Sequence, residues 1–97
     1  MLYITECPFE PNGSLGIWKC SDGKTLMIMC DECNALWLHP SHTSSAEALK
    51  VGSQPYFHPE SSVPIFGGGS GWATKDEVVS KGWMPLVKGE SKPLDEL

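Results

Sequence analysis

The sequence lacks any long apolar run, and none approaches the roughly 20 residues that a membrane-spanning helix needs. Residues 1–7 have neither the basic start nor the long apolar stretch of a signal peptide. We therefore expect a cytoplasmic protein without membrane contact. In a reducing cytosol, cysteines bind metal more often than they pair as disulfides, so disulfides and unliganded buried thiols are the less favoured alternatives.

Basic residues are few and scattered. Seven of them stand against twelve acidic residues, no two are adjacent, and the formal net charge is −5. Binding to nucleic-acid phosphates draws on clustered Lys and Arg, so this balance disfavours nucleic acid as a partner. A basic protein is the partner that the charge favours.

A catalytic set is missing as well. The carboxylates are dispersed along the chain, and no serine lies in a nucleophile-elbow setting. The glycine run at 67–71 precedes a predicted helix but lacks the Gly-Lys-Ser/Thr ending of a phosphate loop, which indicates a flexible linker. We expect a protein that is not an enzyme.

The length of 97 residues predicts a single domain over 1–97, with only a modest core. Its first half reads as β structure, because short apolar runs flank an Asp22-Gly23 turn and follow it. The predicted strands lie at 15–20, 25–29 and 35–38. They form an antiparallel meander.

The second half, residues 40–88, predicts a loop and two short helices. Each helix is marked by Ser or Thr, by Glu three residues later and by a terminal glycine. The two sets are Ser44, Glu47 and Gly52, and Thr74, Glu77 and Gly82. Between them, residues 53–71 hold three prolines and four glycines and predict a long irregular loop. The fold class is therefore α+β, with a polar tail at 89–97 that we expect to fray.

The cysteines supply the material for a metal site. Cys30 and Cys33 are separated by two residues, a gap that lets a tight turn direct two sulfurs toward one point. Cys20 ends the first predicted strand, so we expect the hairpin to bring it near. Cys7 would fold back from the N-terminal segment across residues 11–13. We predict that all four thiolates hold one structural Zn²⁺, because four ligands close the coordination shell.

The Cys30–Cys33 turn, with Cys20 and Cys7, resembles a zinc ribbon over residues 3–38. The resemblance implies a zinc-stapled β-meander in this part of the chain. Zinc ribbons usually supply their ligands as two short-gapped pairs, whereas twelve residues separate the first two cysteines here.

Alternatives remain open for this site. Iron in a rubredoxin-like site would use the same ligands, and zinc is preferred because no electron-transfer feature accompanies the cysteines. His39 is an alternative ligand in place of Cys7, since zinc also binds imidazole, although a surface position is the simpler interpretation. Redox use of the CxxC is disfavoured, because Asp31 and Glu32 lie between the cysteines and would raise the thiol pKa.

The leading functional expectation is a non-enzymatic zinc-binding protein that presents an acidic surface to a protein partner. An inhibitor or immunity protein that neutralises a basic toxin is a special case, supported by size and charge. The alternatives are a nucleic-acid-binding zinc ribbon and a thiol redox protein that uses the CxxC. The first alternative requires five lysines to gather on one face: Lys19, Lys24, Lys50, Lys75 and Lys81.

Overall fold

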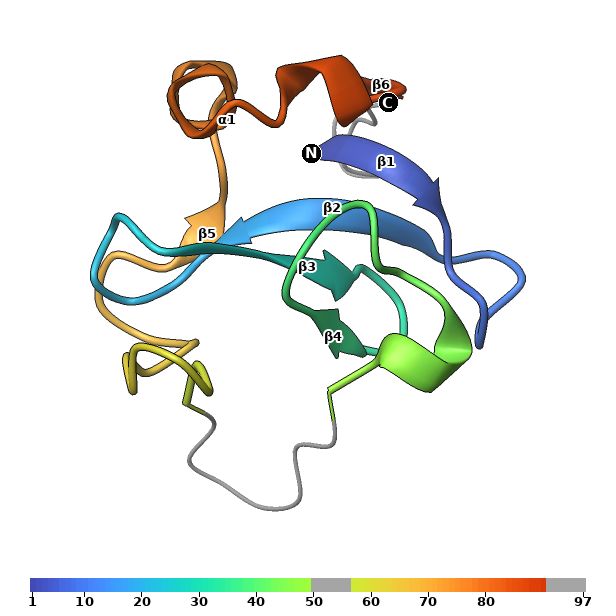
Figure 1. Cartoon of the computed structure of the whole chain (residues 1–97), viewed down its shortest axis with the longest axis horizontal. Helices are drawn as coiled ribbons and strands as arrows, with labels where there is room; N and C mark the ends of the chain where they lie inside the picture. The colour runs from blue at the N-terminus through green and yellow to red at the C-terminus, as the bar shows by residue number, and fades with distance from the viewer. Residues whose placement is uncertain (50–56, 91–97) are drawn as a thin grey trace.

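The computed structural model describes residues 1–49 and 57–90. Their centre is an antiparallel sheet, whose strands in chain order are β1 (Leu2–Glu6), β2 (Ser14–Lys19), β3 (Leu26–Cys30), β4 (Leu36–Trp37), β5 (Gly71–Trp72) and β6 (Gly89–Glu90). Across the sheet the order is β4-β3-β2-β1-β6, and β5 pairs with the end of β2 that β1 leaves free (Figure 1). Within the two described ranges, no helix has the length and apolar character needed to cross a membrane.

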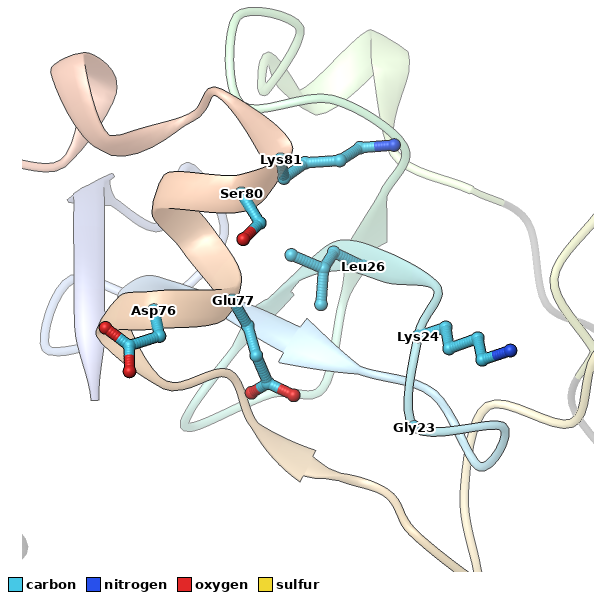
Figure 2. Close-up of a pocket in the computed structure, with 7 residues that line it drawn as sticks. All are labelled: Gly23, Lys24, Leu26, Asp76, Glu77, Ser80 and Lys81. Carbon is cyan, nitrogen blue, oxygen red and sulfur yellow. The ribbon is translucent and has the colours of Figure 1, made fainter.

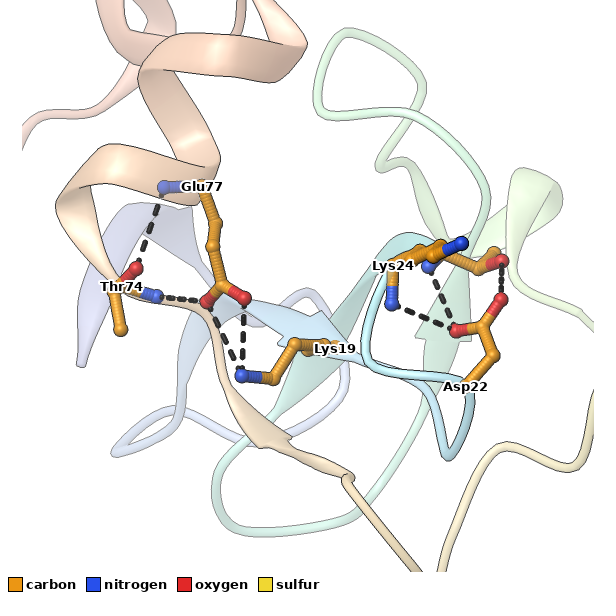
Figure 3. Close-up of polar contacts among 6 residues, drawn as sticks. Lys19, Asp22, Lys24, Thr74 and Glu77 are labelled. Atoms are coloured by element: carbon orange, nitrogen blue, oxygen red, sulfur yellow. Dashed lines mark hydrogen bonds and ion pairs between the residues drawn. The ribbon is translucent and has the colours of Figure 1, made fainter.

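The predicted β2–β3 hairpin is present, and its turn is held by the Asp22 carboxylate. Oδ1 accepts hydrogen bonds from the backbone N–H groups of Lys24 and Thr25 at 2.9 and 2.8 Å, and Oδ2 accepts the Thr25 hydroxyl at 2.6 Å (Figure 3). These bonds, that of the Thr25 hydroxyl first, lower the pKa of Asp22 to about 2. Gly23 supplies the left-handed φ of 72° that the turn requires.

Strand β3 is buried on both faces, because all five of its residues lie inside. Side chains alternate between the faces of a strand, so Ile28 joins a larger apolar cluster that Val78 of the C-terminal helix covers. Met27 and Met29 point to the other face, where they join a smaller cluster around Ile65. The central strand therefore carries core on each side of the sheet.

The second predicted helix is confirmed as α1 (Lys75–Lys81). Its capping box is complete, because Thr74 Oγ1 accepts the Glu77 N–H at 3.3 Å and Glu77 Oε1 accepts the Thr74 N–H at 2.8 Å (Figure 3). Gly82 ends the helix in the left-handed conformation, with φ 83°. The cap residues and the terminal glycine that predicted this helix all have the expected roles in the structure.

The first predicted helix is corrected to a single 3-10 turn, η1 (Ser45–Glu47). Its capping box forms, with Glu47 Oε1 accepting the Ser44 N–H at 3.4 Å, but Ala48 is already extended. No residue of the turn is buried, so it has no apolar face that would stabilise further helical turns. The predicted end at Gly52 lies outside the described residues.

Part of the predicted Gly/Pro-rich loop packs against the hairpin turn. The Ser21 hydroxyl donates to the Pro64 carbonyl at 2.6 Å, and the Gly69 N–H donates to the Ser21 carbonyl at 3.2 Å. The glycine run, expected to be a flexible linker, thus leads into β5 along a defined path. Residues 50–56 of this loop are outside the described part of the chain.

The C-terminal part contains a second 3-10 turn, η2 (Met84–Leu86), and then β6. Strand β6 pairs antiparallel with Leu2 and Tyr3 of β1. The segment predicted to fray from residue 89 therefore begins as an edge strand. The rest of it, residues 91–97, is not described by the structure.

Candidate metal centre

Three thiols converge at one end of the sheet. Cys7 follows β1, Cys30 ends β3, and Cys33 lies in the turn to β4. Their sulfur atoms all lie within 4.8 Å of one another, and the Cys7 and Cys33 sulfurs are 3.6 Å apart. Two sulfurs on a tetrahedral zinc ion with Zn–S bonds of about 2.3 Å would be separated by about 3.8 Å. The group therefore has the donor atoms and the dimensions of a metal site.

The CxxC segment forms a tight turn around its first sulfur. The Cys30 N–H donates to the Ala35 carbonyl at 2.9 Å and closes the turn. Cys30 Sγ accepts the N–H groups of Glu32 and Cys33 at 3.4 and 3.5 Å. Asn34 has a left-handed φ of 60°, a conformation that Asn tolerates better than most residues. The turn thereby directs two thiols to one side and places N–H groups where a thiolate would be stabilised.

The loop from Cys7 to Gly13 brings the third thiol to this turn. The Cys7 N–H donates to the Gly13 carbonyl at 2.9 Å, and Cys7 Sγ accepts the Phe9 N–H at 3.4 Å. A Cβ atom at Gly13 would lie 2.7 Å from Cys30 Sγ, so only glycine fits there without a shift. The Phe9 ring stacks on Trp37 of β4, with ring centroids 6.1 Å apart.

The three thiols differ in exposure, and the pKa values of the two buried ones are shifted in opposite directions. Cys7 and Cys30 are buried, whereas Cys33 is exposed. Burial opposes ionisation of Cys7, but hydrogen bonds from the N–H groups of Phe9 and Glu10, together with those from the neighbouring thiols, outweigh it and lower its pKa. Burial raises the pKa of Cys30 to about 12, and the neighbouring thiols add to this effect. A bound cation would favour the Cys30 thiolate that burial disfavours.

Cys20 lies outside this group, so the predicted convergence of four sulfurs is corrected to three. The Cys20 N–H donates to the Thr25 carbonyl, so Cys20 lies beside Thr25 at the hairpin turn. Cys30 comes five residues after Thr25 along β3, which corresponds to a distance of about 17 Å along the strand. Cys20 also belongs to the opposite face, where its thiol contacts Met27 Sδ at 3.7 Å. Burial, with the charge of Asp22, raises the pKa of Cys20 to about 11.

His39, the predicted alternative to Cys7, is exposed and is not part of the sulfur group. Its Nδ1 accepts the Ser41 N–H at 3.0 Å, and its ring packs edge-on against Trp83 with centroids 5.4 Å apart. His42 Nδ1 lies 3.2 Å from a Glu47 carboxylate oxygen. Both histidines have surface contacts of their own, and it is Cys7 whose sulfur lies with those of Cys30 and Cys33.

A surface pocket of about 360 Å³ lies between the hairpin turn and α1 (Figure 2). Its lining residues are Gly23, Lys24, Leu26, Asp76, Glu77, Ser80 and Lys81. None is a cysteine or histidine, and the Glu77 carboxylate is engaged by the helix cap and by Lys19 Nζ at 3.0 Å (Figure 3). Lysines and carboxylates share the pocket, which has no residue in common with the thiol group.

No family model, curated protein or solved structure matches this chain. The geometry of the three sulfurs is therefore the main indication of what the chain can bind. Gly13 and Asn34 shape this geometry. Gly13 lies in the segment 11–13, across which Cys7 was expected to fold back, whereas Asn34 was not predicted from the sequence. Each had a local signal: Gly13 follows Asn12 in a turn-forming pair, and Asn34 directly follows the CxxC, where a left-handed residue allows the chain to reverse.

Proposed function

We propose that this chain binds one Zn²⁺ ion through Cys7, Cys30 and Cys33. The observation that supports the proposal is the convergence of three sulfurs, from segments far apart in sequence, within 4.8 Å. Thiolates favour zinc over magnesium or calcium, and iron is the competitor that shares this donor preference. The ion would join the loop after β1 to the turn after β3. Its role would then be structural, as in a zinc ribbon.

The proposal extends to a basic protein partner at this end of the molecule. Glu6, Asp31 and Glu32 are exposed beside the three cysteines in sequence. Phe9 lies in the same loop and is 51% exposed, which adds an apolar contact to an acidic rim. Opposite charge would favour association with a basic surface. The inhibitor or immunity role against a basic toxin remains a prediction from size and charge.

The two alternative functions receive less support. Lys19, which a nucleic-acid surface would need, is paired with Glu77, and Lys50 lies outside the described residues. A thiol redox protein depends on a cysteine with a lowered pKa at the start of its CxxC, and the pKa of Cys30 is raised instead. Zinc binding needs no lysine surface, and a bound Zn²⁺ would itself favour the thiolate form of the cysteines.

Elemental analysis of natively purified protein and of single cysteine variants tests the metal site. We expect one zinc per chain in the wild type, loss of zinc in Cys7→Ala, Cys30→Ala and Cys33→Ala, and full zinc content in Cys20→Ala. The last variant is the matched control, because Cys20 is also a buried thiol. Chelation under reducing conditions should lower the melting temperature by about 10 °C or more, since metal binding is coupled to folding.

A wild-type protein that contains no metal, or that melts at the same temperature after chelation, would contradict the zinc site. The partner is tested separately by affinity capture from the source cell with zinc-loaded protein as bait. We expect a basic protein to be recovered at low salt and to be released as the salt concentration rises. Recovery of no protein would contradict the interaction role and leave the metal site untouched.

A further inference from the structure

We infer that Glu10 supplies the fourth ligand of the proposed zinc site, an inference that depends on that site. The backbone turns that begin at Cys7 and at Cys30 share one hydrogen-bond pattern. Cys30 Sγ accepts the N–H groups two and three positions later, and the second of these belongs to the ligand Cys33. Cys7 Sγ likewise accepts the N–H groups of Phe9 and Glu10, two and three positions later. Glu10 thus takes the place in the first turn that Cys33 takes in the second.

The hydrogen bonds that close each turn keep this third-position residue near the sulfurs. The Cys30 N–H donates to the Ala35 carbonyl, and the Cys7 N–H donates to the Gly13 carbonyl, each at 2.9 Å. The first turn is one residue longer, and its Gly13 N–H donates to the Glu10 carbonyl, also at 2.9 Å. This bond holds the Glu10 backbone beside Gly13, which itself lies against the Cys30 sulfur.

The side chain of Glu10 is available for such a role. It is half-buried, whereas the other residues between Cys7 and Gly13 are exposed: Pro8, Phe9, Pro11 and Asn12. Within residues 1–49 and 57–90 its carboxylate has no hydrogen-bond or ion-pair partner. Its oxygens are not among the atoms of the 4.8 Å group, so binding would turn the carboxylate inward about its side-chain bonds.

The chemistry of the completed set is that of a closed structural site. Zinc accepts carboxylate oxygen at about 2.0–2.2 Å alongside thiolate sulfur at about 2.3 Å. Three thiolates and one carboxylate leave the same charge on the site as four thiolates do. If water held the fourth position, the site would be open and one negative charge smaller. The presence or absence of Glu10 as a ligand thus decides whether the site is closed and structural or open to exchange.

The test compares the zinc affinity and the zinc K-edge X-ray absorption of Glu10→Gln, Glu10→Cys and Glu32→Gln with those of the full-length wild type. Glu32→Gln is the matched control, because it removes the same charge from the neighbouring turn at an exposed position. We expect Glu10→Gln to weaken zinc binding about tenfold or more, and Glu32→Gln to have a much smaller effect. The wild type should show three sulfurs and one oxygen around zinc.

Glu10→Cys creates a second CxxC and should restore tight binding with four sulfurs around the ion. This variant also excludes misfolding of the loop as the cause of weak binding in Glu10→Gln. The inference is overturned if Glu10→Gln binds zinc as tightly as Glu32→Gln, or if Glu10→Cys retains three sulfurs. In either case one zinc per chain in the wild type would leave the proposed function standing. A wild type without zinc would overturn both.

Discussion

The two ends of the β2–β3 hairpin are stabilised by different means. At the turn end, Asp22 accepts three hydrogen bonds, and Lys19 joins β2 to the helix cap through Glu77. At the other end, the Cys30 sulfur lies close to the sulfurs of Cys7 and Cys33, which come from the loop after β1 and the turn before β4. Thiols are weak donors and acceptors, so these contacts contribute less than the polar bonds of the turn end.

This difference indicates which end an added ion would stabilise. At the turn end, Asp22, Lys19 and Glu77 have hydrogen-bond or ion-pair partners from the chain itself. The sulfur end brings together thiols that would repel one another once ionised, and a cation would remove that repulsion. Changes at one end should therefore affect zinc content, while changes at the other should affect only the stability of the fold.

The largest effect is expected for Gly13→Ala at the sulfur end. The added Cβ would lie 2.7 Å from Cys30 Sγ and 3.1 Å from Cys7 Cβ, which forces the loop away from the turn. We expect a loss of about 1–3 kcal/mol in the free energy of unfolding, with weaker zinc binding. Urea denaturation and zinc titration measure both. Gly71→Ala is the control, because a Cβ there meets no atom within 4 Å. Equal behaviour of the two variants would contradict the close approach.

Thr74→Ala should have an intermediate effect, confined to the turn end. The variant removes the hydroxyl that accepts the Glu77 N–H at the start of α1. Loss of such a cap costs about 1 kcal/mol in the free energy of unfolding, which thermal or urea denaturation can resolve. Zinc content should remain at the wild-type value. A parallel loss of zinc would show that the two ends are coupled.

Asp22→Asn should have the smallest effect, and one that depends on pH. The folded chain lowers the pKa of Asp22 to about 2, against about 3.9 in an unfolded chain. The ionised carboxylate therefore favours folding above about pH 4, and this contribution disappears as the pH falls toward 2. The wild type should be slightly more stable than Asp22→Asn at neutral pH, because the group is exposed.

Denaturation of both proteins at matched zinc loading and at several pH values measures this difference. It should shrink on acidification, since the variant has no carboxylate to protonate. A stability difference that is constant between about pH 5 and pH 2 would assign the effect to hydrogen-bond geometry rather than to charge.

Local signals allowed much of the fold to be predicted. The Asp22-Gly23 pair indicated the hairpin, and Thr74 with Glu77 indicated helix α1 and its first residue. A capping box alone was insufficient at Ser44, because no buried side chain follows it. Pairing of β1 with β6 joins residues near opposite ends of the sequence, and no local pattern specifies such a contact.

In the candidate site, too, local patterns indicate local features and do not specify contacts between distant segments. Cys30 and Cys33 were identified from their spacing, which is local. The position of Cys20 depends on strand register: a hairpin that turns at Asp22 leaves it at the turn, on the opposite face from Cys30. The predicted hairpin already implied this separation. The approach of Cys7 depends on the seven-residue loop from Cys7 to Gly13, and the close contact of Gly13 with Cys30 appears only when the two segments are placed together.

The stacking of Phe9 on Trp37 has a consequence for how tightly an ion would be held. Trp37 is fully buried and anchored by its indole N–H, which donates to the Ser44 carbonyl at 2.8 Å. The aromatic contact thus holds the Cys7 loop against β4 without an ion, and less disorder would have to be removed on metal binding. Affinity for the metal would accordingly depend on two rings that never touch it.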